Sequence, residues 1–520
     1  MEISKEPSRR VILLGSAAAA MVCAAALLAT SAGLPMVWDE GDAIFRADGI
    51  ARGQWHYTTV REGHPALYGM LIVAGRWISQ AWLSPLSAAR FGPTMLFAAA
   101  AGAMFYRIGR DRSIVAAVAA VAALMTMPRM FAHAHFALLD GPLTSCWVLA
   151  WAAFLPASRS ADRRCRWSTA VVWGIVLGMT FSSKATGWIA PIPFVAWAVV
   201  YRNGTAAKTI AVGLPIALLT FLLLNPPLWH DPLHGWLTFF RLNFNRSGDP
   251  GLNISTWFLG RMYNLKHTLP WYNTLLWTAV TVPIATLLLS GFGLAAAWPP
   301  RRGNATMMLL VFNWAVLLIV RALPGTPPHD GIRLFLPSFA FLAALAGIGC
   351  DALFVQLTSR YGKWCIVLLA ASASTLPLYR PQWLSYYNLL IGGLPGATAM
   401  GMEPTYYWDG LDRSVLDWLH EHTADDEKIC FAASSSRNLV LMQRWRVLRR
   451  ATDRRSPGRF RWYVLQRRPS GYQPADPWLI EHVEPAYRKT LLGTSLVEIY
   501  QYEDFQRACR HVHPEENVLQ

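Results

Sequence analysis

The chain alternates long apolar stretches with short polar segments, and the apolar stretches have the length of membrane-spanning helices. A bilayer core about 30 Å thick is crossed by roughly 20 apolar residues in an α-helix. Eleven stretches approach that length, near residues 11–34, 87–107, 113–130, 139–156, 168–183, 186–201, 208–224, 272–297, 304–322, 333–355 and 364–379. The pattern therefore predicts a mainly α-helical membrane protein with about 11 transmembrane helices.

The first stretch follows Lys5, Arg9 and Arg10, as the apolar region of a secretory signal peptide does. It is longer than the roughly 7–15 residues of such a region. We therefore expect an uncleaved signal anchor.

The composition agrees with a lipid environment. Of 520 residues, 54% are hydrophobic and only 15% are charged, whereas soluble domains carry about 25% charged residues. These values exclude a disordered chain, a coiled coil and a small disulfide-stapled secreted domain, and they disfavour a single soluble enzyme of this length.

The net charge of +16 first suggests a nucleic-acid partner, but its distribution indicates membrane topology. If the N-terminus is cytoplasmic, the inner loops hold 16 basic residues against four acids, which accounts for +12. An excess of Lys and Arg on the cytoplasmic side is the usual orientation signal. We therefore predict a multi-pass protein of the plasma (inner) membrane with no nucleic-acid partner. The inner basic residues are Lys5, Arg9, Arg10, Arg107, Arg110, Arg112, Arg159, Arg163, Arg164, Arg166, Arg202, Lys208, Arg301, Arg302, Arg360 and Lys363.

Three long segments are predicted outside the membrane: residues 35–89, 225–271 and everything after 380. We divide the chain into a transmembrane domain, 1–380, and an extracytoplasmic linker and small domain, 381–520. In the last 110 or so residues, helical patterns alternate with strand-like runs, which predicts a small C-terminal α/β domain. The helical patterns are Leu411–Glu421, Leu439–Trp445 and Trp478–Val483, and the strand-like runs are Ile429–Ala432, Trp462–Leu465 and Leu496–Tyr500.

Two acids, Asp39 and Glu40, begin the first outer loop. From Asp42 to Arg52, the apolar residues Ala43, Ala47, Ile50 and Ala51 have helical spacing, and Gly53 follows. This predicts a short amphipathic helix along the membrane surface. The acids have two interpretations of about equal weight. They cap this helix and complement its dipole, or one of them serves as a general base at the membrane boundary.

A third acid, Asp140, begins the fourth predicted span on the outer side, and the same two interpretations apply to it. His133 and His135 precede it. The three residues could hold a metal ion, but an HxH pair alone is weak evidence, and we predict no metal site.

Basic residues on the outer side are not explained by the orientation signal. Lys184 lies in a predicted tight turn, while Arg321 and Arg333 flank the loop Pro324–Gly331. Long cationic side chains can reach toward lipid headgroups. The alternative, which we favour for Lys184 and Arg333, is a clamp on a lipid-borne phosphate, because ionisable residues at membrane depth are usually functional.

Several of these motifs resemble a known family. Asp39-Glu40, Phe45, an Ala-containing helix ending in Gly, and His64-Pro65-Ala66-Leu67 resemble the first luminal loop of protein O-mannosyltransferases. More broadly, they resemble glycosyltransferase family 39, which includes the aminoarabinose transferase acting on lipid A. Arg333-Leu-Phe-Leu-Pro is similar to the Arg-Tyr-Leu-Leu-Pro signature of this family. His64-Pro65-Ala66 departs from its usual His/Lys-Pro-Pro.

The resemblance covers about residues 10–410 and implies a GT-C fold. It also implies transfer of a sugar, mannose or a similar hexose or modified pentose, from a polyprenyl-phosphate carrier. The acceptor would be a protein, lipid or polysaccharide at the outer face, and the mechanism would be inverting. Asp39 would be the general base, with Glu40 and Asp140 supporting the transition state. The phosphate would leave into a positive pocket, whose predicted members are His64, Lys184, Arg333 and Arg321.

No cofactor beyond the lipid-linked donor is implied, and the need for a divalent cation stays open. Two other classes fit a multi-span chain: a transporter, and a lipid-binding membrane protein without catalysis. Transporters usually show internal repeats and charges near the bilayer midplane. Here the unexplained charges gather at one surface, next to a soluble tail. The pattern therefore favours an interfacial enzyme, without naming the sugar or the acceptor.

Overall fold

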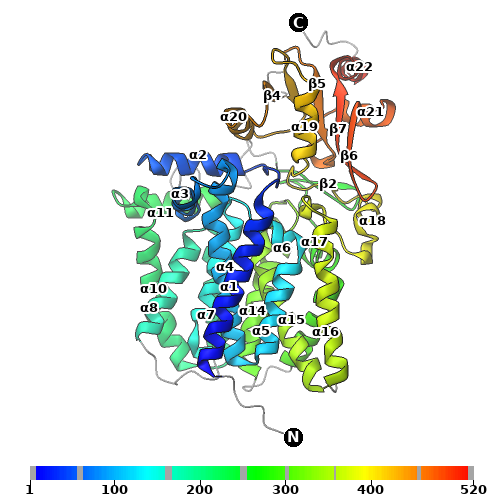
Figure 1. Ribbon diagram of the computed structural model, residues 1–520. Helices are drawn as coiled ribbons and strands as arrows, with labels where there is room; N and C mark the ends of the chain where they lie inside the picture. The colour runs from blue at the N-terminus through cyan, green and yellow to red at the C-terminus, as the bar shows by residue number, and fades with distance from the viewer. Residues whose placement is uncertain are drawn as a thin grey trace.

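A bundle of long helices carries a small β-sheet domain at one end (Figure 1). The computed structural model describes residues 8–512 apart from 56–62, 158–166, 246–253, 299–303, 329, 357–358 and 454–457. We call the end of the bundle next to the sheet domain the sheet end. Helix α1 starts at the opposite end and runs toward the sheet end.

Every predicted apolar stretch coincides with a helix, or with two consecutive helices, of the bundle. The bundle helices are α1 (Arg9–Ser31), α4 (Pro85–Asp111), α5 (Ile114–Thr126), α7 (Asp140–Ala153), α8 (Trp167–Phe181), α9 (Pro191–Val200), α10 (Gly204–Leu223), α12 (Asn273–Thr281), α13 (Ile284–Ala297), α14 (Ala305–Ala322), α15 (Leu336–Gln356), α16 (Ser359–Ala373) and α17 (Thr375–Leu378). The prediction of a mainly helical multi-pass protein is confirmed.

Four stretches among the described residues are long and apolar enough to cross a membrane by length and composition: Arg9–Ser31, Gly204–Leu223, Ala305–Ala322 and Arg333–Phe354. Other apolar helices of the bundle are shorter, such as Ile114–Thr126 and Trp167–Phe181. The count of 11 spans and the cytoplasmic N-terminus therefore stay predictions. Two of the predicted inner basic segments, around Arg159–Arg166 and Arg301–Arg302, lie outside the described residues.

Small residues allow the central helices to approach closely. A Cβ atom at Gly349 of α15 would lie 1.8 Å from the carbonyl oxygen of Leu289 in α13, and one at Gly293 would lie 2.0 Å from that of Leu345. Helices in membranes pack through such small residues, because lipid supplies no hydrophobic driving force between them. The α13–α15 contact therefore depends on both glycines.

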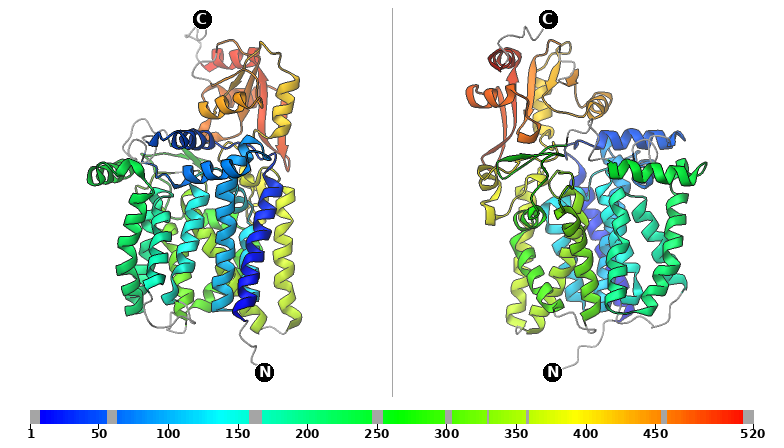
Figure 2. Two further views of the ribbon diagram at one scale, coloured as in Figure 1. Left: turned by 60° about the vertical axis from the view of Figure 1, so that its left-hand side comes forward. Right: turned by 180° about the vertical axis from the view of Figure 1, so that it is seen from behind.

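Short helices lie across the sheet end of the bundle. Figure 2 shows α2 (Glu40–Ala51) and α11 (Pro232–Phe244), in blue and green, roughly perpendicular to the bundle axis. The predicted amphipathic helix is α2, and its residues Ala43, Ala47 and Ile50 are buried, whereas Ala51 is exposed. Helix α3 (Leu67–Ser79) packs against α2. The other short helices of the bundle region are α6 (Pro128–His133) and α18 (Gly393–Ala399), and a hairpin is formed by β1 (Thr256–Phe258) and β2 (Arg261–Tyr263).

The C-terminal domain is a five-stranded mixed sheet in the order β4-β3-β5-β7-β6. Strand β3 is parallel to β4 and β5, whereas β7 is antiparallel to β5 and β6. The elements are α19 (Arg413–Glu421), β3 (Ile429–Phe431), α20 (Ser436–Arg444), β4 (Ala451–Asp453), β5 (Trp462–Gln466), α21 (Ala475–His482), β6 (Tyr487–Leu491), β7 (Thr494–Gln501) and α22 (Tyr502–Val512). The predicted small α/β domain is confirmed, and the strands that the pattern missed are β4 and β6.

The two faces of this sheet belong to different cores because side chains alternate along a strand. Cys430 and Tyr463 pack with Leu479 of α21 and Phe505 of α22. Phe431, the next residue along β3, belongs to the hydrophobic cluster that continues into the membrane bundle. The sheet domain is thus packed on the bundle through one face.

The segment before the sheet domain also packs on the bundle. The ring of Trp383 lies 4.8 Å from that of Phe131, and the backbone N–H of Asn388 donates to the carbonyl of Val280 at 2.9 Å. The predicted division at residue 380 stays a prediction, but the segment that follows it is fixed against the bundle.

Candidate active site

Asp39 lies at the N-cap position of α2, yet its side chain makes no capping hydrogen bond. Its Oδ2 instead accepts from the hydroxyl of Tyr407 at 2.7 Å and from Nη2 of Arg333 at 2.8 Å. The backbone N–H of Trp38 donates to the carbonyl of Tyr407 at 3.3 Å, which holds the two segments together. The Asp39 side chain is 37% exposed, and its Oδ1 has no partner among the described residues. Capping therefore does not explain Asp39.

Glu40 has different surroundings from its neighbour. It is fully buried, and its two oxygens accept from Nε and Nη2 of Arg90 at 2.8 and 2.6 Å. The backbone N–H groups of Ala137 and Val37 also donate to it, at 2.9 and 3.1 Å. Because every contact of Glu40 is internal, the structure gives no support to its predicted catalytic role. Glu40 joins the first loop to α4 and to the segment before α7.

Replacing Glu40 by Gln is expected to destabilise the fold. The change leaves the buried guanidinium of Arg90 without a counter-charge, and breaking one side of a buried ion pair costs about 3–5 kcal/mol. Thermal unfolding of the full chain in detergent, followed by tryptophan fluorescence, measures the effect. Asp42→Asn is the matched control, because Asp42 and Arg437 are part-exposed and exposed pairs contribute about 0–1 kcal/mol. Equal unfolding temperatures for the two variants would contradict the expectation.

Asp140 is the first residue of α7, which has no side-chain capping hydrogen bond. Like that of Asp39, its carboxylate pairs with cations instead. The side chain is 1% exposed. Its Oδ1 accepts from Nζ of Lys184 at 2.6 Å, and its Oδ2 from Nε of Arg333 at 3.2 Å. Lys184 lies in the turn between α8 and the 3-10 helix η3 (Ala185–Ile189), and burial lowers the pKa of its ammonium while Asp140 opposes the shift.

Arg333 links the acids to one another. It begins the 3-10 helix η7 (Arg333–Phe335) at the sheet end of α15. Nε, Nη1 and Nη2 of its guanidinium donate to Asp140, Asp330 and Asp39 respectively, and the bond to Asp330 is 2.7 Å. The guanidinium carbon lies 3.9 Å from the centre of the Tyr407 ring. Five N–H donors are available on a guanidinium, so two remain without a partner among the described residues.

We call Asp39, Asp140, Lys184, Asp330, Arg333 and Tyr407 the polar cluster. Arg468 of the sheet domain also contacts Asp330. The cluster therefore holds three carboxylates and two cations, and the third cation beside it, Arg468, is also paired with Glu403. The expected positive pocket is thus not positive overall. What the cluster offers a phosphate is a set of fixed N–H donors on Arg333 and Lys184.

The loop that carries His64 lies beside the Lys184 turn. The backbone N–H of Leu67 donates to the carbonyl of Ser182 at 3.1 Å. Asn225 bridges the same two segments, accepting from the N–H of Ala66 at 2.9 Å and donating to the Ser182 hydroxyl at 3.3 Å. His64 is half-buried at this edge. The structure thus brings the predicted His64 and Lys184 segments together.

Arg321 lies apart from the polar cluster. Its Nη2 donates to the carbonyl oxygen of Pro327, and its own carbonyl accepts from the Thr326 hydroxyl at 3.2 Å. No contact between described residues joins Arg321 to Asp39, Asp140 or Arg333. Arg321 therefore supports the loop that leads to Asp330, and the structure gives no support to direct substrate binding by it.

The two histidines before Asp140 bind protein groups. His133 hydrogen bonds the Tyr406 hydroxyl at 2.7 Å, and burial lowers its pKa to about 3, so its imidazole is neutral. His135 contacts the Phe131 carbonyl at 2.7 Å and the Thr30 hydroxyl at 2.9 Å. Within the described ranges, no group of three or more His, Cys, Asp or Glu side chains could hold a metal ion. The requirement for a divalent cation stays untested.

Asp409 is a buried acid beside this region. Neither carboxylate oxygen has a hydrogen-bond partner among the described residues, and burial raises its pKa to about 7 from 3.8. A carboxyl whose pKa is raised on folding binds a proton more tightly in the folded state. Its contribution to stability is therefore complete below about pH 4 and is lost as the pH rises through 7.

Asp409→Asn is expected to remove this pH dependence. Between pH 5 and 8, the unfolding temperature of the wild type should fall relative to that of the variant, since the variant has no proton to lose. Thermal unfolding at each pH measures the difference. The control Asp417→Asn changes an acid whose side chain is 60% exposed and should leave the wild-type profile unchanged. Parallel profiles for Asp409→Asn and the wild type would contradict the interpretation.

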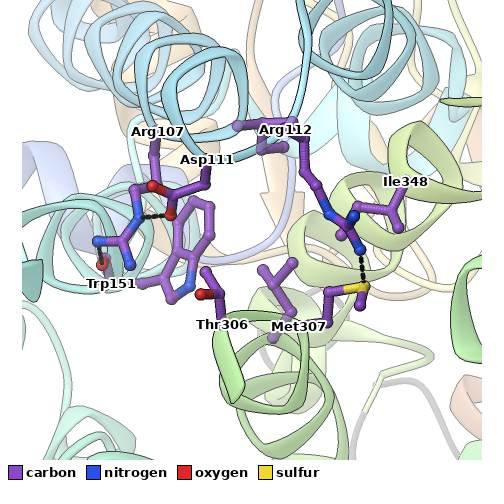
Figure 3. Close-up of a pocket in the computed structure, with 9 residues that line it drawn as sticks. Arg107, Asp111, Arg112, Trp151, Thr306, Met307 and Ile348 are labelled. Carbon is purple, nitrogen blue, oxygen red and sulfur yellow. Dashed lines mark hydrogen bonds and ion pairs between the residues drawn. The ribbon is translucent and has the colours of Figure 1, made fainter. Parts of the chain in front are cut away.

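A small cavity lies elsewhere, near the end of α4 that is remote from the sheet domain. Figure 3 shows Arg107 and Asp111 paired on one side of it and Arg112 directed at Met307 on the other. Its volume is about 10 Å³. Nη1 of Arg107 donates to the carbonyls of Ala152 and Phe154 at 3.2 and 3.0 Å, and a cation is favourable at the C-terminus of a helix such as α7. This region joins α4 to α7 and is separate from the polar cluster.

Three members of the site region were not predicted as site residues: Asp330, Tyr407 and Arg468. Asp330 lies in the loop flanked by Arg321 and Arg333, so its position three residues before the predicted phosphate-binding Arg333 was the available signal. Tyr407 belongs to an aromatic run that joins the bundle to the tail. No local pattern distinguishes Arg468 from the other arginines of the tail.

The bundle, the helices lying across its sheet end and the polar cluster there together define a class: membrane proteins with the fold of the GT-C glycosyltransferases. The model of the family described as dolichyl-phosphate-mannose-protein mannosyltransferase matches residues 64–230. That stretch includes His64, Asp140 and Lys184, but neither Asp39 nor Arg333. The resemblance to O-mannosyltransferases and the aminoarabinose transferase is confirmed.

Among solved structures, the chain is similar to ArnT from Cupriavidus metallidurans in the apo state, with a TM-score of 0.53 and 13% identity over 94% of this chain and 98% of that one. ArnT bound to undecaprenyl phosphate gives a TM-score of 0.50 and 15% identity, covering 95% of this chain and 98% of that one. The archaeal oligosaccharyltransferase AglB from Archaeoglobus fulgidus gives 0.51 and 12%, covering 87% and 69%. Among proteins of curated function, none matches the chain in sequence.

Proposed function

We propose that this protein transfers a sugar from a polyprenyl-phosphate carrier to an acceptor at the membrane surface, with inversion at the anomeric carbon. One observation carries the proposal: a part-exposed carboxylate, Asp39, pairs at the sheet end with Arg333, the same cation that holds Asp140 and Asp330. A general base and phosphate-binding donors are the two components that such a transfer needs.

Asp39 is suited to the role of base. Its Oδ2 is held by Arg333 and Tyr407, while Oδ1 is open to an incoming group. A base must lie within hydrogen-bond reach of the proton that it takes. We infer that Oδ1 accepts the proton of the acceptor hydroxyl or amine.

Arg333 and Lys184 are suited to bind the carrier phosphate. Each keeps donors that its carboxylate partners do not use, and each is held in place by those partners. Donors that are fixed before the reaction stabilise developing charge without reorganisation. The half-buried His64 lies on the loop beside the Lys184 turn and is a further candidate contact.

The chemistry balances without a cofactor. The acceptor oxygen or nitrogen forms a bond to the anomeric carbon, the bond from that carbon to the phosphate oxygen breaks, and the acceptor proton passes to Asp39. The polyprenyl phosphate leaves with one more negative charge than the donor carried. Asp140, held between Lys184 and Arg333, supports the positive character that develops on the sugar.

The similar structures support the choice of donor class. One is described as ArnT bound to undecaprenyl phosphate, and another as AglB in complex with an inhibitory peptide and a dolichol-phosphate. A lipid carrier would reach the cluster from the bilayer, and we place the reaction on the extracytoplasmic side because of the basic inner loops. Mannose, a similar hexose or a modified pentose remain the proposed sugars, and a protein, lipid or polysaccharide the proposed acceptor.

The test uses the full chain in lipid vesicles with two labelled donors, undecaprenyl-phosphate mannose and an undecaprenyl-phosphate aminopentose. Protein, lipid and polysaccharide fractions serve as acceptors, and vesicles without the chain are the control. The expected result is label in one fraction, with inverted anomeric configuration and release of undecaprenyl phosphate. Two outcomes would overturn the proposal. In one, the donor crosses the membrane with its labelled sugar still attached. In the other, the label remains on the donor whichever acceptor fraction is supplied.

A further inference from the structure

Arg468 of the sheet domain reaches the polar cluster. It is the second residue after β5, and its side chain is 2% exposed. Nη2 donates to Oδ1 of Asp330, and Nε lies 3.3 Å from Oε2 of Glu403. These acids lie outside the sheet domain, one before α15 and one before α19. Arg468 is therefore a charged contact from the sheet domain to the bundle.

Asp330 connects this contact to the proposed reaction centre. Its Oδ1 faces Arg468, while its Oδ2 accepts from Nη1 of Arg333 at 2.7 Å. The other nitrogens of Arg333 hold Asp39 and Asp140. One carboxylate is thus shared between a cation of the sheet domain and the cation that orients the proposed base.

Aromatic packing fixes the position of Arg468. Its guanidinium carbon lies 3.6 Å from the centre of the Trp408 ring, and the opposite neighbour of that ring is Trp38, 4.2 Å away between centroids. Trp408 has a φ angle of 54°, a left-handed conformation that is an outlier for a bulky residue and persists only where the surroundings over-determine it. Trp38 directly precedes Asp39, so this stack also ends at the proposed base.

Glu403 and the first loop complete the arrangement. Glu403 accepts from the backbone N–H of Ser470 at 3.1 Å, which fixes the loop that carries Arg468 next to Glu403. On the other side of the domain, Asn438 accepts from the N–H of Gly41 at 2.8 Å and donates to the Val37 carbonyl at 2.9 Å. Asn438 of the sheet domain therefore holds Val37 and Gly41, which lie on either side of Asp39 in the sequence.

We propose that Arg468 is a positioning residue for sugar transfer: by holding one oxygen of Asp330, it limits how far that carboxylate can draw Arg333 away from Asp39 and Asp140. Without Arg468, Oδ1 of Asp330 loses this cation, and the carboxylate pairs more completely with Arg333. Arg333 then turns from Asp39, and the base loses its orientation. This inference rests on the proposed function, and it makes the sheet domain part of the active site.

The test compares Arg468→Gln with Arg467→Gln in the full chain. Arg467 lies in the same loop but pairs with Glu498 within the sheet domain, at 3.1 Å. A displacement of about 1 Å at a reacting group can cost about 10²-fold in rate. We expect a loss of kcat of about 10- to 100-fold for Arg468→Gln with a smaller change in KM for the donor, a partial recovery in Arg468→Lys, and wild-type kinetics for Arg467→Gln.

A double variant separates positioning from loss of domain packing. If Arg468 acts through Asp330, Arg468→Gln combined with Asp330→Asn loses no more activity than the worse single variant, because both act on one interaction. Losses that multiply, or equal losses in the Arg467 and Arg468 variants, would overturn the proposal.

Hydrogen exchange gives a readout that does not need transfer. Residues 330–335 should exchange faster in Arg468→Gln than in Arg467→Gln or the wild type. A wild-type chain that transfers no sugar would overturn the proposed function and leave this comparison valid. Unchanged exchange in Arg468→Gln would overturn the positioning role whether or not transfer occurs.

Discussion

Replacing Asp39 by Asn is expected to lower the rate of sugar transfer by about 10²- to 10⁴-fold, the usual contribution of a general base. Asn has nearly the shape of Asp and can still accept a hydrogen bond from Arg333 or Tyr407, so the loop should keep its conformation. It cannot take a proton from the acceptor. The loss should therefore appear in kcat, with the KM for the lipid-linked donor changed much less.

The measurement is steady-state transfer from labelled donor in vesicles. Asp48→Asn is the matched control: it removes an acid from the same helix, α2, whose partner is Arg76 of α3 instead of the polar cluster. The control should keep wild-type kinetics. An Asp39→Asn variant that transfers sugar at the wild-type rate would remove Asp39 from the mechanism.

Replacing Arg333 by Ala should have an effect of similar size for a different reason. The change removes three charge-assisted hydrogen bonds and leaves Asp140 with Lys184 as its cationic partner. Loss of one preorganised donor to a developing oxyanion costs about 10²- to 10³-fold. Both kcat and the donor KM should suffer, because the same guanidinium orients Asp39 and is proposed to bind the phosphate.

Arg333→Lys and Arg321→Ala show which property of Arg333 matters. Lys keeps the charge but not the planar fork that reaches three carboxylates, so it should recover donor binding more than kcat. Arg321 is a cation of the neighbouring helix end that lies outside the cluster, and its loss should be much milder. If Arg321→Ala and Arg333→Ala lowered the transfer rate equally, Arg321 would have to be counted as a member of the site. Normal transfer by both Asp39→Asn and Arg333→Ala would reject the assignment as a whole.

The helices were predictable because lipid imposes a simple requirement on sequence. A run of about 20 apolar residues has few other solutions, and the stretches from 11–34 to 364–379 accordingly match helices of the bundle. The strands β4 and β6 were not predicted. Strand β4 reads Ala-Thr-Asp, and strand β6 alternates part-buried and exposed residues, so neither has the continuous apolar run of β3 or β5.

The candidate site was predictable only where a charge conflicted with its surroundings. Lys184 and Arg333 are cations on the predicted outer side, where the orientation signal does not explain them. The local sequence does not distinguish Asp39 from Glu40. The difference depends on Arg90, which lies 50 residues away in the sequence and pairs with Glu40. The Asp330–Arg468 contact joins residues 138 positions apart, and no local pattern encodes such a pair.

The three carboxylates of the polar cluster have a consequence for turnover in the proposed reaction. The glycosyl phosphodiester donor carries one negative charge, whereas the released monoester approaches two near neutral pH, since the second pKa of such phosphates is about 6. A strongly positive site would retain that product most tightly of all. Here Asp39, Asp140 and Asp330 pair with the same donors that we propose for the phosphate, so directed hydrogen bonds would hold the monoanion while the carboxylates would repel the dianion. In the proposed reaction, the spent carrier would thereby be returned to the bilayer.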